Sequence, residues 1–283
     1  MQKKILLFLS VSLLVISCST IRGLTDIQEP DVEFTNVSIQ NISFDGVTLL
    51  FDFNVTNPNS MGVNAEGYSY EFFINDQSFL TGTQEEAISI GKESSSLIQV
   101  PVSMSFSELY QTFGSIVKQD SLSYKLSTEV AFDMSAFGSR RVPVEASGVL
   151  PIPKPPRIRF GGIDVKNMSF SGADVEATFR VINPNAFGIA LTGAKYILDV
   201  NGRNWLDTEL EERIDISGSE NKTIVIPIRL NTAQMGSAML DIMGGKKEFN
   251  YKLRGSANIS ADLEGFSENQ ELPFELEGVY QLE

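Results

Sequence analysis

The sequence predicts a mainly β protein made of two tandem copies of one antiparallel domain. The first observation is a repeated stretch: Phe53-Asn-Val-Thr-Asn-Pro-Asn-Ser-Met-Gly62 returns 126 residues later as Phe179-Arg-Val-Ile-Asn-Pro-Asn-Ala-Phe-Gly188. The second is an alternation of apolar and polar residues through most of each copy, which is typical of strands with one buried face. The third is the length of 283 residues, which lets each copy bury its own core.

The repeat and the changes in composition divide the chain into five segments. We expect a leader at 1–17, a tether at 18–30, a first domain at 31–150, a linker at 151–157 and a second domain at 158–283. The linker reads Pro151-Ile-Pro-Lys-Pro-Pro-Arg157, and four of its seven residues are proline. Such a composition favours an extended, semi-rigid spacer.

Two strands are expected at the start of the first domain. Apolar residues alternate with polar ones from Val32 to Ile42, and again from Val47 to Val55. The intervening Asp45-Gly46 is a hairpin signal, because both residues accept the positive φ angles of tight hairpin turns. These runs therefore predict antiparallel pairing with one apolar face.

A second hairpin and two edge strands follow from turn residues and prolines. Asn75-Asp76 separates two β-type runs, and the second copy has Asn201-Gly202 at the matching place. Pro101 and Pro227 stand within matching strand-like runs. Because proline cannot donate to a β-ladder, these runs are predicted to be edge strands.

One helix is expected late in each copy. Residues 107–118 place Leu109, Phe113, Ile116 and Val117 at helical spacing, with Ser107 as N-cap. In the second copy, the corresponding helix is expected from Asn231 to Met243 and ends before two glycines. Each domain should then contain about seven strands and one short α-helix.

The motifs Asn57-Pro58-Asn59 and Asn183-Pro184-Asn185 each end a predicted strand. Proline removes a backbone donor and fixes φ near −65°, so the strand stops or lies at an edge. The first asparagine can close an Asx turn, and the second tolerates a left-handed backbone. We interpret both motifs as shaped corners. Ligand binding is the alternative interpretation, and neither motif has the residue types of a catalytic site.

The first 18 residues resemble a bacterial lipoprotein leader. A basic start at Lys3 and Lys4 precedes a short apolar run, which is typical of a secretory signal and too short to span a membrane. The boundary Val15-Ile16-Ser17-Cys18 resembles a lipobox, which implies cleavage before Cys18 and acyl chains such as palmitate on that residue. By resemblance to the sorting rule of diderm bacteria, Ser19 in place of aspartate favours the outer membrane. The alternative is an ordinary signal peptide with a chance cysteine.

Composition argues against several classes of function. The net charge of −14 repels phosphate backbones, so nucleic-acid binding is not expected. The chain has no histidine and one cysteine, which removes the usual general base, the commonest metal ligand and any intramolecular disulfide. The acidic pairs Glu85-Glu86 and Glu211-Glu212 read as solvated loops, with weak calcium binding as the alternative. We expect no metal and no cofactor.

Taken together, the pattern resembles type 2 late embryogenesis abundant proteins, which contain the Water stress and Hypersensitive response domain. The resemblance rests on the strand before Asn-Pro-Asn, the glycine corner, the Tyr-centred hairpin, the Val100-Pro-Val102 strand and the helix after it. It implies two immunoglobulin-like or fibronectin-III-like β-sandwiches, a role in desiccation or other abiotic stress, and no enzymatic activity. The Asn-Pro-Asn residues carry over as structural markers.

The sequence therefore supports a non-catalytic stress-protective or binding module, held by its lipid at a membrane and facing the periplasm or the cell surface. One alternative is a scaffold that pairs its edge strands with envelope proteins or binds a small apolar ligand. A hydrolase that uses carboxylates alone is a third hypothesis, but no two carboxylates at suitable spacing recur in the sequence.

Overall fold

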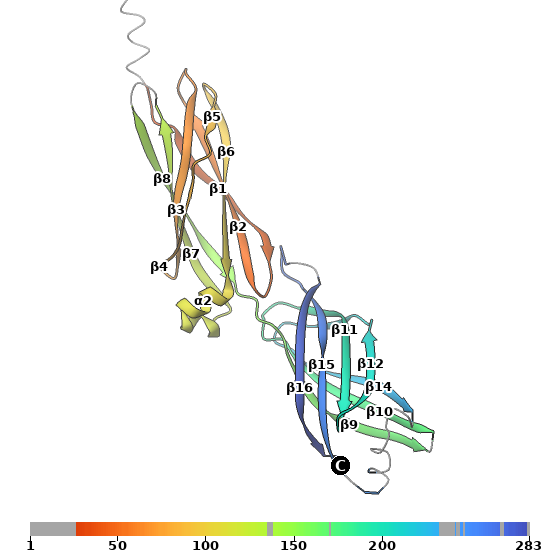
Figure 1. Ribbon diagram of the computed structural model, residues 1–283. Coiled ribbons are helices and arrows are strands. Elements are labelled where there is room, and N and C mark those ends of the chain that lie inside the picture. The colour runs from red at the N-terminus through yellow and green to blue at the C-terminus, as the bar shows by residue number, and fades with distance from the viewer. Residues whose placement is uncertain are drawn as a thin grey trace, which may run out of the picture. The chain divides into compact units, whose positions relative to one another are not determined.

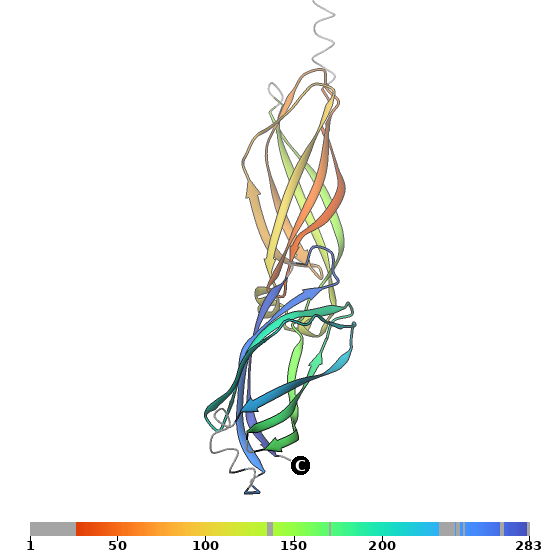
Figure 2. The same cartoon turned by 90° about the vertical axis from the view of Figure 1, so that its right-hand side faces the viewer.

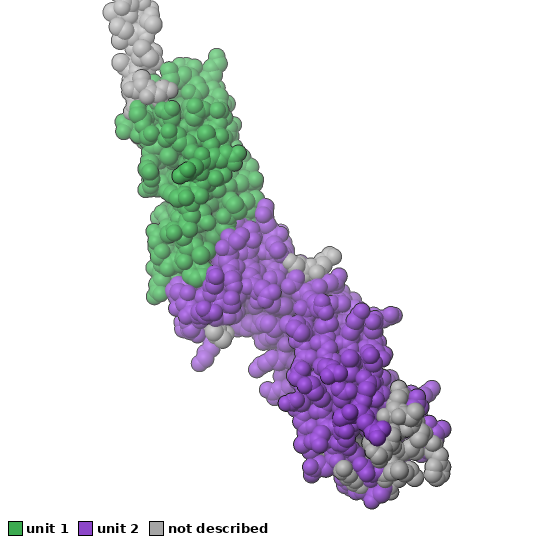
Figure 3. All heavy atoms as spheres, in the orientation of Figure 1, with its two compact units in different colours: residues 1–38, 50–102, 122–150 green, residues 39–49, 103–121, 151–283 purple. Residues whose placement is uncertain are grey.

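The structure is a computed structural model that describes residues 27–134, 138–169, 171–231, 241, 244–245, 247–266 and 269–281. The chain divides into two compact units (Figure 3). One unit comprises residues 1–38, 50–102 and 122–150, and the other comprises residues 39–49, 103–121 and 151–283. The second unit thus includes two short pieces of the first repeat.

The described part of each repeat contains eight strands in two antiparallel sheets (Figure 1). In the first repeat, a sheet of order β1-β2-β6 accompanies a sheet of order β4-β3-β7-β8, and β5 also pairs with β3. The elements are β1 Asp31–Ile42, β2 Gly46–Asn57, β3 Val63–Ile74, β4 Gln77–Gln84, β5 Ile88–Ile90, β6 Ser94–Ser105, α2 Phe106–Thr112, the 3-10 helix η1 Gly114–Lys118, β7 Ser121–Asp133 and β8 Ser139–Pro151.

The second repeat has the same strand order. One sheet runs β14-β10-β9 and the other β12-β11-β15-β16, with β13 also paired to β11. Figures 1 and 2 show β9 and β10 (green) and β15 and β16 (blue) in different layers. The strands are β9 Arg157–Ser169, β10 Gly172–Ile182, β11 Ile189–Val200, β12 Arg203–Leu210, β13 Ile214–Ile216, β14 Asn221–Asn231, β15 Glu248–Ala261 and β16 Gln270–Gln281. The prediction of two tandem β-sandwiches is confirmed.

The predicted turns at Asn75-Asp76 and Asn201-Gly202 and the two predicted edge strands are also confirmed, whereas the predicted hairpin of β1 and β2 forms without positive φ angles at Asp45 or Gly46. Asn75-Asp76 and Asn201-Gly202 join their strands with positive φ angles of 47° and 64°, and of 49° and 76°. These are the angles that two-residue hairpins require. Pro101 lies in β6 and Pro227 in β14, and both strands lie at the end of a three-stranded sheet.

The helix prediction was wrong in its details. The expected helix over residues 107–118 is divided into α2 and the 3-10 helix η1, because Phe113 leaves helical geometry at φ −126° and ψ 70° and is followed by Gly114, a poor helix former. The N-cap position belongs to Ser105, whose side chain makes no capping hydrogen bond, and Ser107 is already inside the helix. In the second repeat, Asn231 ends β14, and the expected helix lies almost wholly outside the described residues.

The two cores differ in their side chains. In the first repeat, Phe51 lies edge-on to Phe72 at 6.4 Å and to Tyr124 at 5.7 Å between ring centroids. The second repeat has Ala177 at the position of Phe51 and Leu198 at that of Phe72. Both replacements are buried, so the second core is built from smaller groups.

Candidate functional site

The first Asn-Pro-Asn corner is a closed network of buried amides. Asn57 is fully buried, and its Oδ1 accepts hydrogen bonds from the backbone N–H (3.0 Å) and Nδ2 (2.9 Å) of Asn59. Its Nδ2 donates to the carbonyl oxygens of Met61 at 2.8 Å and Gly91 at 2.9 Å. The side chain of Asn57 therefore shapes the corner after β2 and ties it to the turn after β5.

Asn59 extends this network to the residue that leads into the domain. Its Oδ1 accepts the backbone N–H of Gln28 at 2.8 Å, and its Nδ2 donates to the carbonyl of Gln28 at 2.9 Å. One side-chain amide thus binds both polar backbone groups of a residue that precedes β1, as a neighbouring strand would. Neither Asn59 nor Asn185 adopts the left-handed backbone that asparagine tolerates.

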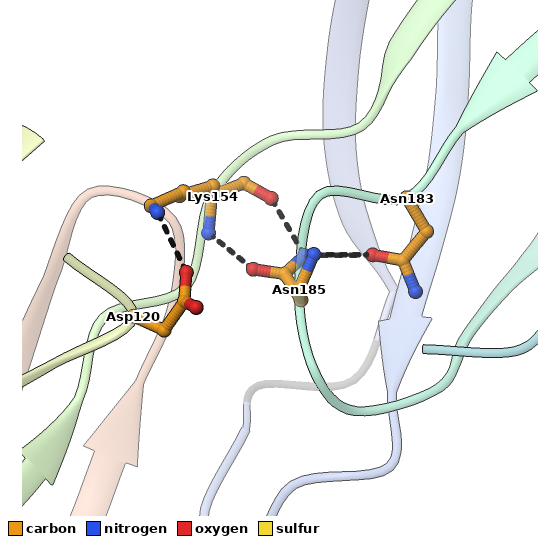
Figure 4. Close-up of polar contacts among 4 residues, drawn as sticks. All are labelled: Asp120, Lys154, Asn183 and Asn185. Atoms are coloured by element: carbon orange, nitrogen blue, oxygen red, sulfur yellow. Dashed lines mark hydrogen bonds and ion pairs between the residues drawn. The ribbon is translucent and has the colours of Figure 1, made fainter. Parts of the chain in front are cut away.

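The second corner repeats this geometry (Figure 4). Asn183 accepts from the backbone N–H and Nδ2 of Asn185, both at 3.0 Å, and donates to Phe187 at 2.8 Å and Ser217 at 3.0 Å. Asn185 then binds Lys154, accepting from its backbone N–H at 2.7 Å and donating to its carbonyl at 2.8 Å. Gln28 and Lys154 stand at matching places in the two repeats.

The linker residue Lys154 makes one further contact inside the second unit. Its Nζ lies 2.8 Å from Oδ1 of Asp120 (Figure 4). The N–H of Ile152, two residues earlier, donates to the carbonyl of Asp120 at 3.0 Å. Ile152 and Pro153 are buried. The linker is therefore bound along its length by backbone hydrogen bonds and packing.

The structure brings together the motif residues Asn57 with Asn59 and Asn183 with Asn185, and it places Pro58 and Pro184 at the turns between them. Pro58 is exposed and Pro184 half-buried. Gln28 and Lys154 were not predicted from the sequence, because the corner binds their backbone and therefore demands no residue type. Their matching distance of 31 residues from Asn59 and Asn185 was the one available signal.

Cys18 and the leader lie outside the described residues. No helix in the described ranges is long and apolar enough to cross a membrane. Among the same residues, no group of three or more His, Cys, Asp or Glu side chains is placed to hold a metal ion.

The resolved pKa shifts all point away from neutral pH. Hydrogen bonds from Lys166 to Asp164 and Glu176 raise the pKa of Lys166. The hydrogen bond between Lys252 and Glu275 raises the pKa of the lysine and lowers that of the glutamate. Burial raises the pKa of four tyrosines, Tyr68, Tyr110, Tyr124 and Tyr196. A general acid or base needs a pKa near the working pH, and these shifts move the other way.

An apolar cavity of about 50 Å³ lies between the two sheets of the second repeat. Its wall is entirely apolar. Residues of both sheets line it: Ile158, Phe179, Val181, Ile224 and Ile226 from one, and Leu191, Ala194, Tyr196, Leu210, Leu253, Ala257 and Phe274 from the other.

Comparison with known families gives two matches along the chain. The sequence model of a family described as Late embryogenesis abundant protein matches residues 52–148 and 178–278. Together these regions cover more than half of the chain, one in each repeat. No curated protein matches.

Solved structures give weaker likenesses. A protein from Archaeoglobus fulgidus has a TM-score of 0.30 at 15% identity, over 46% of this chain and 97% of that one. The solution structure of a putative late embryogenesis abundant protein has a TM-score of 0.38 at 21% identity, over 51% and 87% of the two chains. A protein from Arabidopsis thaliana has a TM-score of 0.37 at 21% identity, over 45% and 85%. With TM-scores this low, the family match alone carries the argument.

Proposed function

The chain belongs to the type 2 late embryogenesis abundant family, in two tandem copies, and we propose that it is a non-catalytic protein of the desiccation and abiotic stress response. The observation that carries this proposal is the double family match. The protein would act by contact, binding or protecting other molecules as water is lost. Its acidic, mixed-charge surface supports this role, because a net charge of −14 favours solubility and limits self-association.

The second part of the proposal is attachment to the cell envelope through acyl chains on Cys18, with the outer membrane favoured. The support is the leader sequence, whose apolar run ends at the chain's one cysteine. Intact-mass measurement of the protein purified from membranes tests it. We expect a mature chain that begins at Cys18 and carries acyl mass, and an unmodified chain that starts elsewhere would contradict the anchor.

The stress role is tested by deleting the gene and measuring survival after drying and after osmotic shock. We expect lower survival, full restoration by the wild-type gene and weaker restoration by Cys18→Ser. Unchanged survival of the deletion strain would contradict the role. Full restoration by Cys18→Ser would contradict the need for the anchor while leaving the protective role in place.

A second candidate is an interaction protein that pairs its edge strands with envelope partners. The observation that favours it is a matched pair of exposed apolar residues on edge strands: Val149 on β8 is 69% exposed, and Val279 on β16 is 58% exposed. Unprotected edges accept another strand, and lysine on an edge blocks such pairing. We expect Val149→Lys and Val279→Lys to abolish capture of a partner if this candidate is right. Unchanged capture would count against it.

A further inference from the structure

We propose that the second repeat binds the end of an unbranched, uncharged alkyl chain in the cavity between its sheets, and that the first repeat is closed to such a ligand. This inference goes beyond the protective role and does not depend on it. It rests on a difference in residue type between the two copies of the domain. The residues that differ are cross-strand neighbours in one row of the larger sheet.

The row runs across three strands of the larger sheet. In the first repeat, Tyr68 of β3 pairs with Gln84 of β4 and with Val130 of β7. In the second repeat, the matching row is Leu210, Ala194 and Ala257 on β12, β11 and β15. Tyr68 and Val130 thus correspond to two alanines in the second repeat. The polar Gln84 corresponds to the apolar Leu210. All three residues of the second row line the cavity.

Tyr68 shows what closes this place in the first repeat. Its hydroxyl donates a long hydrogen bond of 3.4 Å to the carbonyl of Gln99, which lies on β6 of the opposite sheet. The tyrosine thus spans the gap between the two sheets. Ala194 at the matching place ends at Cβ and reaches nothing across the gap.

The cavity has a buried floor and an open mouth. Seven of its lining side chains are buried, including Leu191, Ile224 and Leu253. The other five are half-exposed: Ile158, Ala194, Leu210, Ile226 and Phe274. An apolar mouth exposed to water gains free energy when an apolar group covers it, because that group and the wall both leave water.

The volume selects the shape of the ligand. About 50 Å³ accommodates a few water-sized groups, whereas a cavity that binds benzene measures roughly 150 Å³. A ring does not fit without rearrangement, but the last few carbons of a linear chain do. Each methylene that enters should raise the affinity about fourfold until the cavity is filled.

The surroundings of the mouth bear on the head group of the ligand. Glu211 and Glu212 are exposed and directly follow Leu210. The nearby cation Lys195 is 3.2 Å from Glu209, and Arg213 is 2.8 Å from Asp215. On the other side, the exposed Arg157 and Arg159 flank Ile158, so charges of both signs surround the apolar mouth. A carboxylate would lose hydration against this apolar rim, so we expect an uncharged head group on the chain.

The test uses the chain from residue 18 onward with Cys18→Ser, so that no acyl group of the protein itself competes. Methyl NMR follows titration with 1-octanol, octanoate and cyclohexanol. We expect saturable shifts at Leu191, Ile224 and Leu253 with 1-octanol, and at least about tenfold weaker binding of the other two. No saturable shift, shifts of equal size in the first repeat, or equal binding of cyclohexanol or octanoate would overturn the proposal.

Two variants distinguish binding of 1-octanol in the cavity from binding elsewhere on the second repeat. Ala194→Tyr restores the closure seen at Tyr68 and should weaken 1-octanol binding at least about tenfold while the melting temperature stays unchanged or rises. Ile197→Tyr adds a ring on the opposite face of β11, away from the cavity and without a change of charge, and should leave binding unchanged. If Ala194→Tyr retains wild-type affinity, the cavity is not the site. Should Ala194→Tyr unfold the repeat, Ala257→Val makes the smaller test, with the same expected weakening.

Discussion

Asn59 binds both backbone polar groups of Gln28, with 2.8 Å from its Oδ1 to the amide nitrogen and 2.9 Å from its Nδ2 to the carbonyl oxygen. Asn185 binds Lys154 in the same way at 2.7 Å and 2.8 Å. The two asparagines are identical, but the residues that they hold are a glutamine and a lysine. We call each pair of hydrogen bonds from the asparagine side chain to these backbone groups the clamp. Since the clamp binds backbone atoms alone, the side chain of the clamped residue can vary without loss of the clamp.

Removal of the clamp should destabilise its repeat. We expect Asn185→Ala to lower the free energy of unfolding by about 2–4 kcal/mol, because three side-chain hydrogen bonds are lost, two to Lys154 and one to Asn183, and the backbone groups of Lys154 are left without their partner. Urea unfolding measures the loss, and the exposed Asn221→Ala serves as the control, with a change within about 0.5 kcal/mol. A loss no larger than that of the control would show that water replaces the clamp.

The side chain of Lys154 should matter much less than its backbone. Lys154 Nζ and Asp120 Oδ1 form an ion pair at 2.8 Å, in which the lysine side chain is 20% exposed and the aspartate side chain 68% exposed. Because the carboxylate is open to water, the pair should contribute about 0–1 kcal/mol, so Lys154→Ala should cost less than Asn185→Ala, and 1 M salt should reduce that cost. Equal costs for the two variants in urea unfolding would contradict the backbone clamp.

Two matched glycines leave room for tyrosine rings. A Cβ on Gly148 would lie 2.5 Å from the hydroxyl of Tyr124, and one on Gly278 would lie 3.0 Å from that of Tyr251. We expect Gly148→Ala to lower stability by about 1–3 kcal/mol and Gly278→Ala by less, because the closer ring must move further. Gly188→Ala is the control, since its Cβ meets nothing nearer than 3.8 Å. Thermal unfolding ranks the three variants, and the reverse order would refute the steric argument.

Alkaline pH should weaken the fold. Burial raises the pKa of Tyr124 and Tyr196 above the ordinary value of 10.0, so each tyrosine loses its proton more readily in the unfolded chain than in the folded one. Their contribution to stability is full below pH 10 and falls as pH rises through the raised folded pKa. Urea midpoints should therefore be level from about pH 7 to 9 and fall above about pH 10, with a smaller fall in Tyr124→Phe. A midpoint that stays level well above pH 10 would contradict this.

Local signals in the sequence predicted most of the fold. Alternation over Val47–Val55, the Asn75-Asp76 turn and Pro101 each act within a few residues, so their structural consequences are readable without the partner strand. The break at Phe113 was not readable, because Leu109, Phe113 and Ile116 keep helical spacing even though the backbone changes its geometry.

The site was less predictable than the fold, for a physical reason in each case. The Asn-Pro-Asn corners were predicted, but the clamp on Gln28 and Lys154 was not, since a backbone partner leaves no trace in residue type. The cavity depends on the pairing of Ala194 on β11 with Ala257 on the neighbouring β15, and that register is set only when the sheet forms. The sequence shows a tyrosine at position 68 and an alanine at position 194, but it does not show that this position lies between the two sheets, where a tyrosine closes the cavity.

Protection by contact during water loss can be measured on a drying-sensitive enzyme. The enzyme is dried and rehydrated with the mature chain, or with an equal mass of serum albumin, and its recovered activity is measured. We expect a clearly higher recovery with the mature chain, and a recovery equal to that with albumin would rule out protection by contact.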